Sequence, residues 1–215
     1  MISKRINLFL LLSGVVVLFT CKPGVTGDSE QLPKPEIKGG KPLMIALRDR
    51  CSTREFSKKE LTSQELSNLL WAANGINRSE TGKRTAPSAC NNQDIDIYVA
   101  LKSGVYLYHF KEHQLEKRTD MDIRSEIGPQ SFIKDAPVTL IFVADFKKTC
   151  GNDSSKIIYS SADAAYISEN VYLFCASENL ATVVLGMVNR AKLSEKLALR
   201  KEQKIVFAQP VGSMK

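Results

Sequence analysis

Three polar side chains alternate in the segment DRCSTREF, residues 49–56. Arg50, Ser52 and Arg54 stand at every second position, so in an extended segment all three leave the backbone on the same side. Two guanidinium groups and a hydroxyl on one face can hold a phosphate or the carbonyl-rich edge of a ring, because arginine presents charge-assisted donors in a fixed plane. Alternating arginines are also common on a solvated surface, so the segment alone leaves both interpretations open.

A second polar segment begins as a turn, KRTAPSACNNQD, and continues as the alternating run IDIYVAL. Pro87 and Ser88 stand between small alanines, and small residues let a flat ligand approach the backbone closely. Asn91 and Gln93 add amide donors and acceptors for the polar edge of such a ligand. The alternative interpretation is a loop whose asparagine side chains hydrogen-bond to its own backbone.

A third pattern, HFKEH at His109–His113, matches the inverted zinc-protease motif H-x-x-E-H. Metal binding would require both histidines on one face of a helix. The preceding residues VYLY alternate as a strand does and lead into a turn. We therefore expect no metal site here, and two solvent-facing histidines at the end of a strand.

The elements that would position these segments can be read from their periodicity. Thr62 and Glu65 form the pattern of a capping box before an amphipathic helix that Gly75 would end. Residues 95–101 alternate as a half-buried strand, and residues 104–110 would return as its hairpin partner. Residues 136–145, APVTLIFVAD, are almost continuously apolar, which is typical of a central strand covered on both faces.

The C-terminal half mixes both kinds of element. We expect a helix from about Ala162 to Glu178, with an apolar stripe that includes Ile167 and Cys175. A short strand at residues 181–187, a helix near 192–199 and a last strand in KIVFAQPVG would follow. Because strict βαβ alternation is absent, the pattern predicts a layered α+β domain with a mixed or antiparallel central sheet flanked by helices, and not a doubly wound sheet.

The N-terminus predicts export. Residues 1–20 combine Lys4 and Arg5 with an apolar run that is shorter than the roughly 20 residues needed to span a bilayer, as in a secretory signal peptide. The sequence LFTC, which ends at Cys21, resembles a lipobox, although Phe and Thr stand where small residues are usual. We expect a lipoprotein anchored through Cys21 in the periplasm or cell envelope; a cleaved soluble form and a retained anchor are the alternatives.

Composition divides the remainder into a tether and one domain. Residues 21–42 are rich in Pro, Gly and charge, so we expect a flexible tether, followed by a single domain at residues 43–215. The formal net charge of +7 is scattered, without a basic block interleaved with aromatics, so we expect no nucleic-acid partner. Cys51, Cys90, Cys150 and Cys175 lack metal or redox spacing; they could pair in an oxidising compartment or remain unreactive thiols.

Seven pieces of the chain, taken in order, resemble the FMN-dependent nitroreductase family, in particular its SagB-type dehydrogenase branch. They cover residues 43–212 and read RCSTREF, LSNLLWAANGINR, RTAPSACNNQDIDIYV, GVYLY, APVTLIFVAD, ADAAYISENVYLFCASENLATVVLG and PVG. The resemblance implies a nitroreductase-like homodimer with one FMN in each of two pockets at the subunit interface. It assigns the cofactor contacts to Arg50, Ser52, Arg54, Pro87, Ser88, Asn91, Gln93, Leu185 and Gly186.

In this arrangement the arginines come from one subunit, the amide-bearing loop from the other, and the Leu185–Gly186 step lies beside the reactive edge of the flavin. The resemblance implies no catalytic side chain, because the flavin itself exchanges hydride or electrons between a reductant, such as NAD(P)H, and a small conjugated substrate. Because NAD(P)H is not expected outside the cytoplasm, the alternative is a non-catalytic flavin- or ligand-binding lipoprotein. The apolar helix stripe would support the dimer, and the two cofactor segments could bring Cys51 and Cys90 together as a disulfide.

Overall fold

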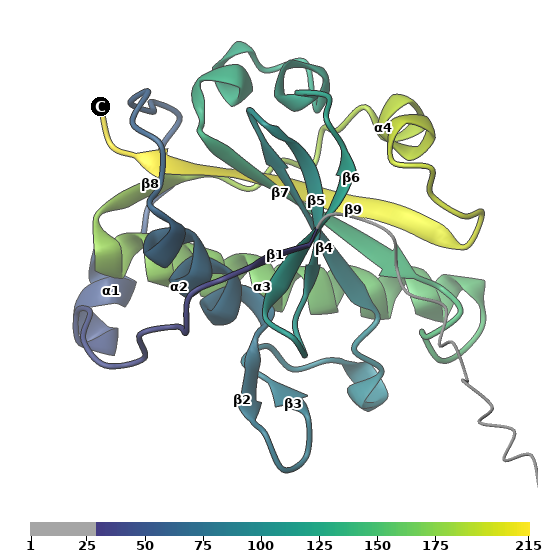
Figure 1. The fold of residues 1–215 in the computed structure, drawn as a ribbon. Coiled ribbons are helices and arrows are strands. Elements are labelled where there is room, and N and C mark those ends of the chain that lie inside the picture. The colour runs from purple at the N-terminus through teal and green to yellow at the C-terminus, as the bar shows by residue number, and fades with distance from the viewer. Residues whose placement is uncertain (1–28) are drawn as a thin grey trace, which may run out of the picture.

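The computed structural model describes residues 29–215 of the chain (Figure 1). The predicted signal peptide, Cys21 and the first part of the predicted tether lie outside the described residues. The main sheet has seven strands, and every neighbouring pair is antiparallel. In spatial order they are β1 (Ser29–Gln31), β6 (Gln114–Thr119), β5 (Gly104–His109), β4 (Ile95–Leu101), β7 (Val138–Asp145), β9 (Gln203–Ser213) and β8 (Leu180–Thr182).

The other elements pack around this sheet or project from it. The α-helices are α1 (Leu43–Asp49), α2 (Ser63–Asn74), α3 (Asp153–Glu178) and α4 (Arg190–Lys196). Short 3-10 helices occur at Ala89–Asn91, Arg124–Glu126 and Ser131–Asp135, and β2 (Ile76–Arg78) pairs with β3 (Lys83–Arg84) in a separate hairpin. The predicted α+β class with an antiparallel sheet and flanking helices is confirmed.

Strand β7 lies inside the sheet, between β4 and β9, and all of its residues are buried. Leu140 and Phe142 belong to the core under α2 and α3. Ile141 and Val143 belong to the core on the opposite face, which α4 and two of the 3-10 helices cover (Figure 1). The continuous apolar run thus has the predicted cause, since alternate side chains enter different cores.

Helix α2 begins as the sequence predicts. The backbone N–H of Thr62 donates to Glu65 Oε2 at 2.7 Å, and the backbone N–H of Glu65 donates to Thr62 Oγ1 at 3.1 Å. Gly75 follows the helix but has a φ of −74°, so it is not a left-handed cap. A Cβ there would lie 2.6 Å from Cδ1 of Trp71, which makes close approach to that ring the reason for glycine.

Helix α3 starts at Asp153, well before the predicted Ala162, and Asn152 caps it by accepting a hydrogen bond from the N–H of Ser155 at 2.9 Å. Its apolar stripe, including Ile167 and Cys175, is buried in the chain's own core, so the stripe does not support the predicted dimer. The exposed apolar side chains of α3 are Ile157, Ile158, Tyr159 and Tyr166. Within residues 29–215, no helix has the length and apolar character needed to cross a membrane.

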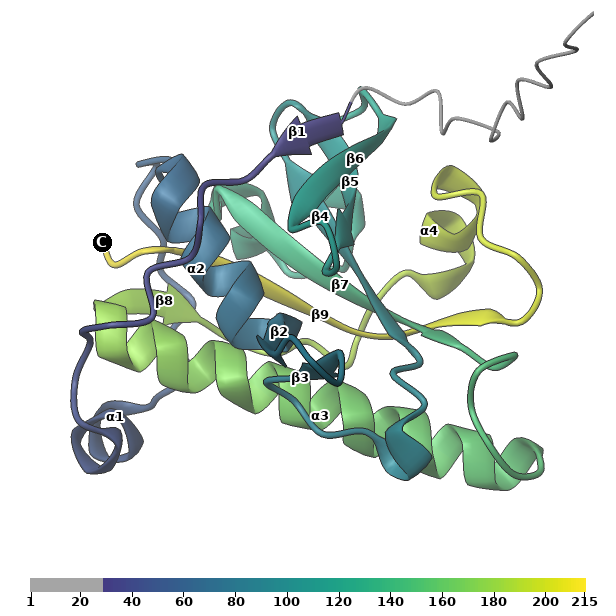
Figure 2. The same ribbon diagram turned by 60° about the horizontal axis from the view of Figure 1, so that its bottom comes forward.

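The prediction of a flexible tether is wrong for residues 29–42. Strand β1 pairs with β6 at the sheet edge, and Leu32 is 4% exposed in the core. The following segment lies along α2 and leads to α1 (Figures 1 and 2). Ser67 Oγ donates to the carbonyl of Pro33 at 2.6 Å, and the N–H of Glu36 donates to Asn68 Oδ1 at 2.8 Å. Polar side chains of α2 thus hold a segment that has few apolar residues of its own.

The C-terminal elements differ from the predicted ones mainly in their bounds. Strand β8 covers Leu180–Thr182 instead of the expected residues 181–187, and Leu185 then forms an isolated bridge with Ala208. Helix α4 covers Arg190–Lys196 instead of residues 192–199.

Candidate functional site

The arginine segment, residues 50–54, leaves α1 and crosses the end of the sheet that β8 and β9 form. The N–H of Thr53 donates to the carbonyl of Thr182 at 2.9 Å, and Phe56 bridges to Met214. The segment is not helical, as the alternation of its polar residues requires.

Tyr172 of α3 connects the arginine segment to the chain that follows β8. Its hydroxyl lies 2.9 Å from Ser52 Oγ and accepts a hydrogen bond from the N–H of Val184 at 2.9 Å. The guanidinium carbon of Arg50 lies 5.3 Å from the centre of the Tyr172 ring, a cation–π arrangement. Sequence reasoning missed Tyr172, and no motif marks it, because its role depends on two segments that are distant in sequence.

The positive charges of the arginine segment are not neutralised within the described chain. Arg54 is exposed, and neither arginine forms an ion pair with any of residues 29–215. The adjacent carboxylate of Asp49 lies 2.9 Å from Arg48 Nε and 3.2 Å from Lys41 Nζ, and the hydrogen bond from Arg48 lowers its pKa. The acid next to Arg50 in the sequence is therefore committed to other bases.

The Leu185–Gly186 step offers an open backbone close to Val184. Both the N–H and the carbonyl of Leu185 bond to Ala208, at 2.7 and 3.1 Å. Apart from Gly186 itself and its two chain neighbours, no residue has an atom within 4 Å of the position that a Cβ on Gly186 would occupy. A flat ring can therefore approach the backbone at Gly186, whereas the N–H of Leu185 is already used.

The amide loop, residues 87–93, is a tightly bonded turn. Ser88 Oγ accepts from the N–H of Gln93 at 2.9 Å, and Gln93 Nε2 donates to the carbonyl of Gly82 at 3.0 Å. Cys90, Asn91 and Gln93 have φ values of 53°, 54° and 50°. The left-handed region costs a non-glycine residue roughly 1 kcal/mol or more, so the surrounding contacts hold this loop in a strained form.

A buried carboxyl pair lies beneath the amide loop. Asp163 of α3 is 2% exposed and accepts from the N–H of Ala89 at 3.0 Å. Burial raises the pKa of Asp163 to about 6, and its hydrogen bond with Asp94 adds to the rise. Asp94 accepts from Thr149 Oγ1 at 2.7 Å, and its other oxygen is buried without a further partner in the described chain. A proton on Asp163 supplies that partner.

Asp163 is a second residue that sequence reasoning missed. The available signal was a charged residue directly before Ala164 of the apolar stripe.

The structure does not bring the two predicted clusters together within one chain. Tyr172, at the arginine segment, and Asp163, at the amide loop, are separated by two and a half turns of α3, a rise of about 13 Å. Figures 1 and 2 agree that α1 lies at the C-terminal end of α3, while the 3-10 helix of the amide loop lies toward the other end.

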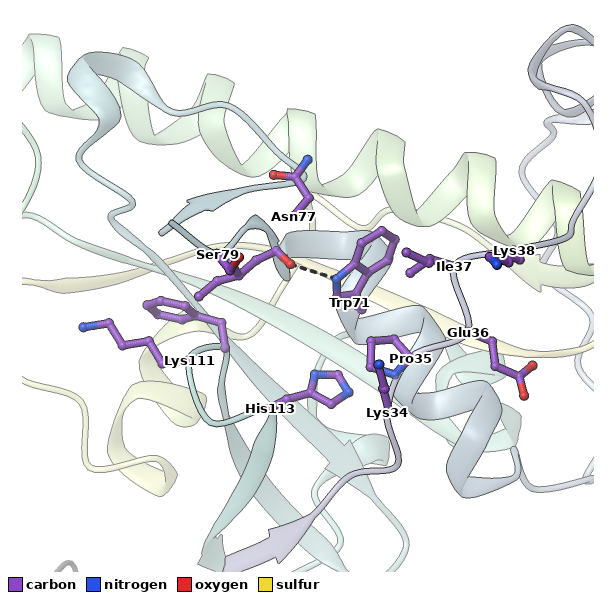
Figure 3. Close-up of a pocket in the computed structure, with 12 residues that line it drawn as sticks. Lys34, Pro35, Glu36, Ile37, Lys38, Trp71, Asn77, Ser79, Lys111 and His113 are labelled. Atoms are coloured by element: carbon purple, nitrogen blue, oxygen red, sulfur yellow. Dashed lines mark hydrogen bonds between the residues drawn. The ribbon is translucent and has the colours of Figure 1, made fainter. Parts of the chain in front are cut away.

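A cavity of about 750 Å³ lies elsewhere (Figure 3). Pro35, Trp71, Phe110 and His113 contribute to its wall, and Trp71 is fixed by a 3.0 Å hydrogen bond from its Nε1 to the carbonyl of Ile76. None of the predicted cofactor residues lines it, so cavity size does not identify the predicted site.

The two histidines are half-buried and have side-chain partners, so they are less exposed than predicted. His113 lies 2.7 Å from Ser67 Oγ and 2.8 Å from Tyr108 OH, and burial lowers its pKa. His109 Nε2 lies 2.6 Å from Glu116 Oε2. They flank the turn between β5 and β6 instead of one helix face, and residues 29–215 contain no cluster of three metal-ligating side chains.

The cysteines do not form the expected pair within one chain. Sγ of Cys90 lies 3.0 Å from Sγ of Cys150. Cys51 is exposed and lies 3.5 Å from Thr53 Oγ1, while Cys175 is buried. Within the described chain Cys90 therefore lies against Cys150, and a Cys51–Cys90 pair between two subunits stays a prediction.

Comparisons with known proteins agree with this architecture. The model of the Nitroreductase family matches residues 47–213. A Methanocaldococcus jannaschii protein is 30% identical over 86% of this chain and 98% of its own. A Ralstonia eutropha JMP134 crystal structure is 40% identical over 89% of this chain and 92% of its own, with a TM-score of 0.84. Both are named "putative nitroreductase".

A more distant structure, the NADPH:FMN oxidoreductase of Vibrio harveyi complexed with NAD+, shows likeness of fold alone. It is 17% identical, with a TM-score of 0.62, over 80% of this chain and 69% of its own.

Proposed function

The chain belongs to the nitroreductase family, and from this premise we propose that it is an FMN-dependent oxidoreductase of the SagB-type branch. Family membership supports oxidoreductase chemistry. The observation that carries the cofactor assignment is the pair of arginines without ion-pair partners among residues 29–215, Arg50 and Arg54, in a segment that Tyr172 links to Val184, two residues before the open backbone of Gly186. Among polar ligands, an anionic group attached to a flat ring fits that combination.

The residues present fit FMN in charge and in shape. Arg54 and Ser52 would hold the phosphate, since guanidinium and hydroxyl groups donate to phosphate oxygens. Arg50, braced against Tyr172, would face the polar edge of the ring and favour negative charge there. Because Gly186 has no side chain, the ring could lie against its backbone. Bound FMN would supply the hydride or electron exchange between a reductant and a small conjugated substrate.

We propose that a second copy of the chain completes the pocket with its amide loop. The two clusters lie apart along α3, so an antiparallel neighbour would set the loop of one copy, including Pro87 and Asn91, against the arginine segment of the other. Exposed apolar side chains on α3 and α1 support such an interface: Leu43, Met44, Leu47, Ile157, Ile158, Tyr159 and Tyr166. Their burial would add hydrophobic stabilisation to the dimer.

The reductant and the compartment are parts of the same proposal. The name of the Vibrio harveyi structure supports NAD(P)H as a class of reductant. The basic and apolar residues before Cys21 support export and lipid anchoring, which would place the enzyme at the cell envelope and favour another donor, such as a quinol. Mass spectrometry of the membrane-extracted protein tests this point: an acylated Cys21 at the N-terminus supports it, and an intact, unmodified N-terminus contradicts it.

FMN titration of the purified protein tests the function. Arg54→Ala should weaken FMN binding about tenfold or more, because a charge-assisted hydrogen bond contributes about 1.5–3 kcal/mol. Arg48→Ala removes the same charge from a neighbouring exposed position and should change the affinity less than about twofold. Equal effects of the two variants would contradict the assignment. Anaerobic mixing with NADH, NADPH or a quinol then tests turnover, since bound FMN that none of them reduces indicates a binding protein.

A further inference from the structure

Two thiols from distant parts of the chain meet at the amide loop. Cys90 is in the 3-10 helix Ala89–Asn91, and Cys150 lies between β7 and α3, two residues before the helix cap Asn152. Their sulfur atoms are 3.0 Å apart, although 60 positions separate them in sequence. Cys90 is exposed and Cys150 is partly exposed, so small oxidants can reach the pair.

The contact is already close to the geometry that a covalent bond requires. A disulfide has an S–S distance of about 2.05 Å, so the two sulfurs need to approach by only about 1 Å. The pKa of Cys90 is raised, first by its hydrogen bond with Cys150, which keeps the reduced pair as neighbouring thiols. The other described cysteines have different surroundings: Cys51 is exposed beside Thr53, and Cys175 is buried.

We propose that Cys90 and Cys150 are a redox-active thiol pair whose oxidation forms an intrachain disulfide and fixes the amide loop to the N-terminal end of α3. Both S–H bonds break, an S–S bond forms, and two protons and two electrons leave the pair. Hydrogen peroxide takes them up as two water molecules. A low-molecular-weight disulfide takes them up as two thiols, through a mixed disulfide with one of the cysteines.

A Cys90–Cys150 disulfide would restrict the conformation of the amide loop. Cys90 has a left-handed φ of 53°, and the neighbouring backbone is held by the Ala89–Asp163 hydrogen bonds. A disulfide at Cys90 would exclude the unstrained conformations that this loop could otherwise adopt. Resting on the proposed function, in which this loop completes the FMN pocket, the oxidised protein should bind FMN roughly two- to fivefold more tightly through preorganisation.

Peptide mapping without reductant tests the pair directly. The reduced full-length protein is treated with stoichiometric hydrogen peroxide or with oxidised glutathione, alkylated and digested. We expect a Cys90–Cys150 cross-linked peptide, with Cys51 unlinked or carrying glutathione. The melting temperature should rise by roughly 5–10 °C, because the bond closes a long loop in the unfolded chain.

Matched variants make the outcome decisive. Cys90→Ser and Cys150→Ser should each abolish the cross-link and the thermal shift, whereas Cys51→Ser should retain both. Only mixed adducts, or cross-links that involve Cys51, would overturn the proposal.

FMN titration of the reduced and oxidised proteins tests the effect of the disulfide on FMN binding separately from FMN binding itself. Disulfide formation with unchanged FMN affinity rejects the effect on the loop and leaves the thiol pair established. Absence of FMN binding in both forms rejects the proposed function, while the peptide map still decides whether the pair forms.

Discussion

Replacing Asp163 by asparagine should stabilise the folded protein above about pH 7, because this buried carboxyl carries an electrostatic cost when it ionises. Asp163 is 2% exposed, and its pKa rises from an ordinary 3.8 to about 6. Below 3.8 the folded and unfolded states are both protonated and the cost is absent. Between these two pKa values the free energy of unfolding falls as the pH rises. Above about pH 6 the folded state has also lost its proton, and the full cost of the buried charge is present.

The magnitude follows from the size of the shift. A rise of about 2 pKa units corresponds to about 3 kcal/mol of destabilisation above pH 7, as an upper value. An asparagine keeps an oxygen that can accept from the N–H of Ala89, and its amide can donate to the unpaired oxygen of Asp94. We therefore expect Asp163→Asn to be more stable than the native chain by about 1–3 kcal/mol above pH 7, with a difference near zero at about pH 4.

Urea unfolding of both proteins at about pH 4 and about pH 8 measures this difference. The exposed Asp153→Asn in the first turn of α3 is the matched control and should show no comparable pH-dependent gain. If Asp163→Asn proves less stable than the native chain by the same amount at both pH values, the carboxyl is not held protonated by burial, and the account of the loop is wrong.

Three further substitutions test local interactions by urea unfolding. Tyr172→Phe leaves the N–H of Val184 without its partner and should cost about 1–3 kcal/mol, while also weakening FMN binding; unchanged stability would contradict the link. Thr62→Ala should cost about 1 kcal/mol through loss of the capping box, and no loss would contradict it. Gly104→Ala should cost more than about 2 kcal/mol, because φ is +131° and a Cβ would overlap the carbonyl of Thr119; a smaller cost would show that the turn relaxes.

The sequence predicts those parts of the fold whose cause is local. The Thr62–Glu65 box, the alternating strand β4 and the continuous apolar run of β7 each carry their pattern within a few residues, and each is confirmed. The start of α3 was missed because its first turns are rich in serine and have no apolar stripe. The docking of residues 29–42 was missed because it depends on partners such as Ser67, which are distant in sequence.

In the candidate site, likewise, local patterns are visible in the sequence and tertiary contacts are not. The alternation of Arg50 and Arg54 is visible in the sequence itself, and the segment that carries it is not helical. The roles of Tyr172 and Asp163 depend on which segments α3 brings together, and no spacing records that. The contact of Cys90 with Cys150 likewise arises from tertiary structure across 60 positions, so cysteine spacing gave no sign of it.

A shared pocket predicts that two defective chains can restore one another. One chain would carry Arg50→Ala and Arg54→Ala, the other Ser88→Ala and Gln93→Ala, each with a different affinity tag so that only mixed dimers are purified. In such a dimer one pocket collects both sets of defects and the other pocket collects none.

The most direct measurement is the FMN content of that mixed dimer at saturation, compared with dimers of each variant alone. We expect one FMN per mixed dimer and almost none in dimers of either variant alone. An empty mixed dimer, or FMN retained by one of the parent variants, would contradict the claim that the arginine segment of one copy and the amide loop of another enclose the cofactor.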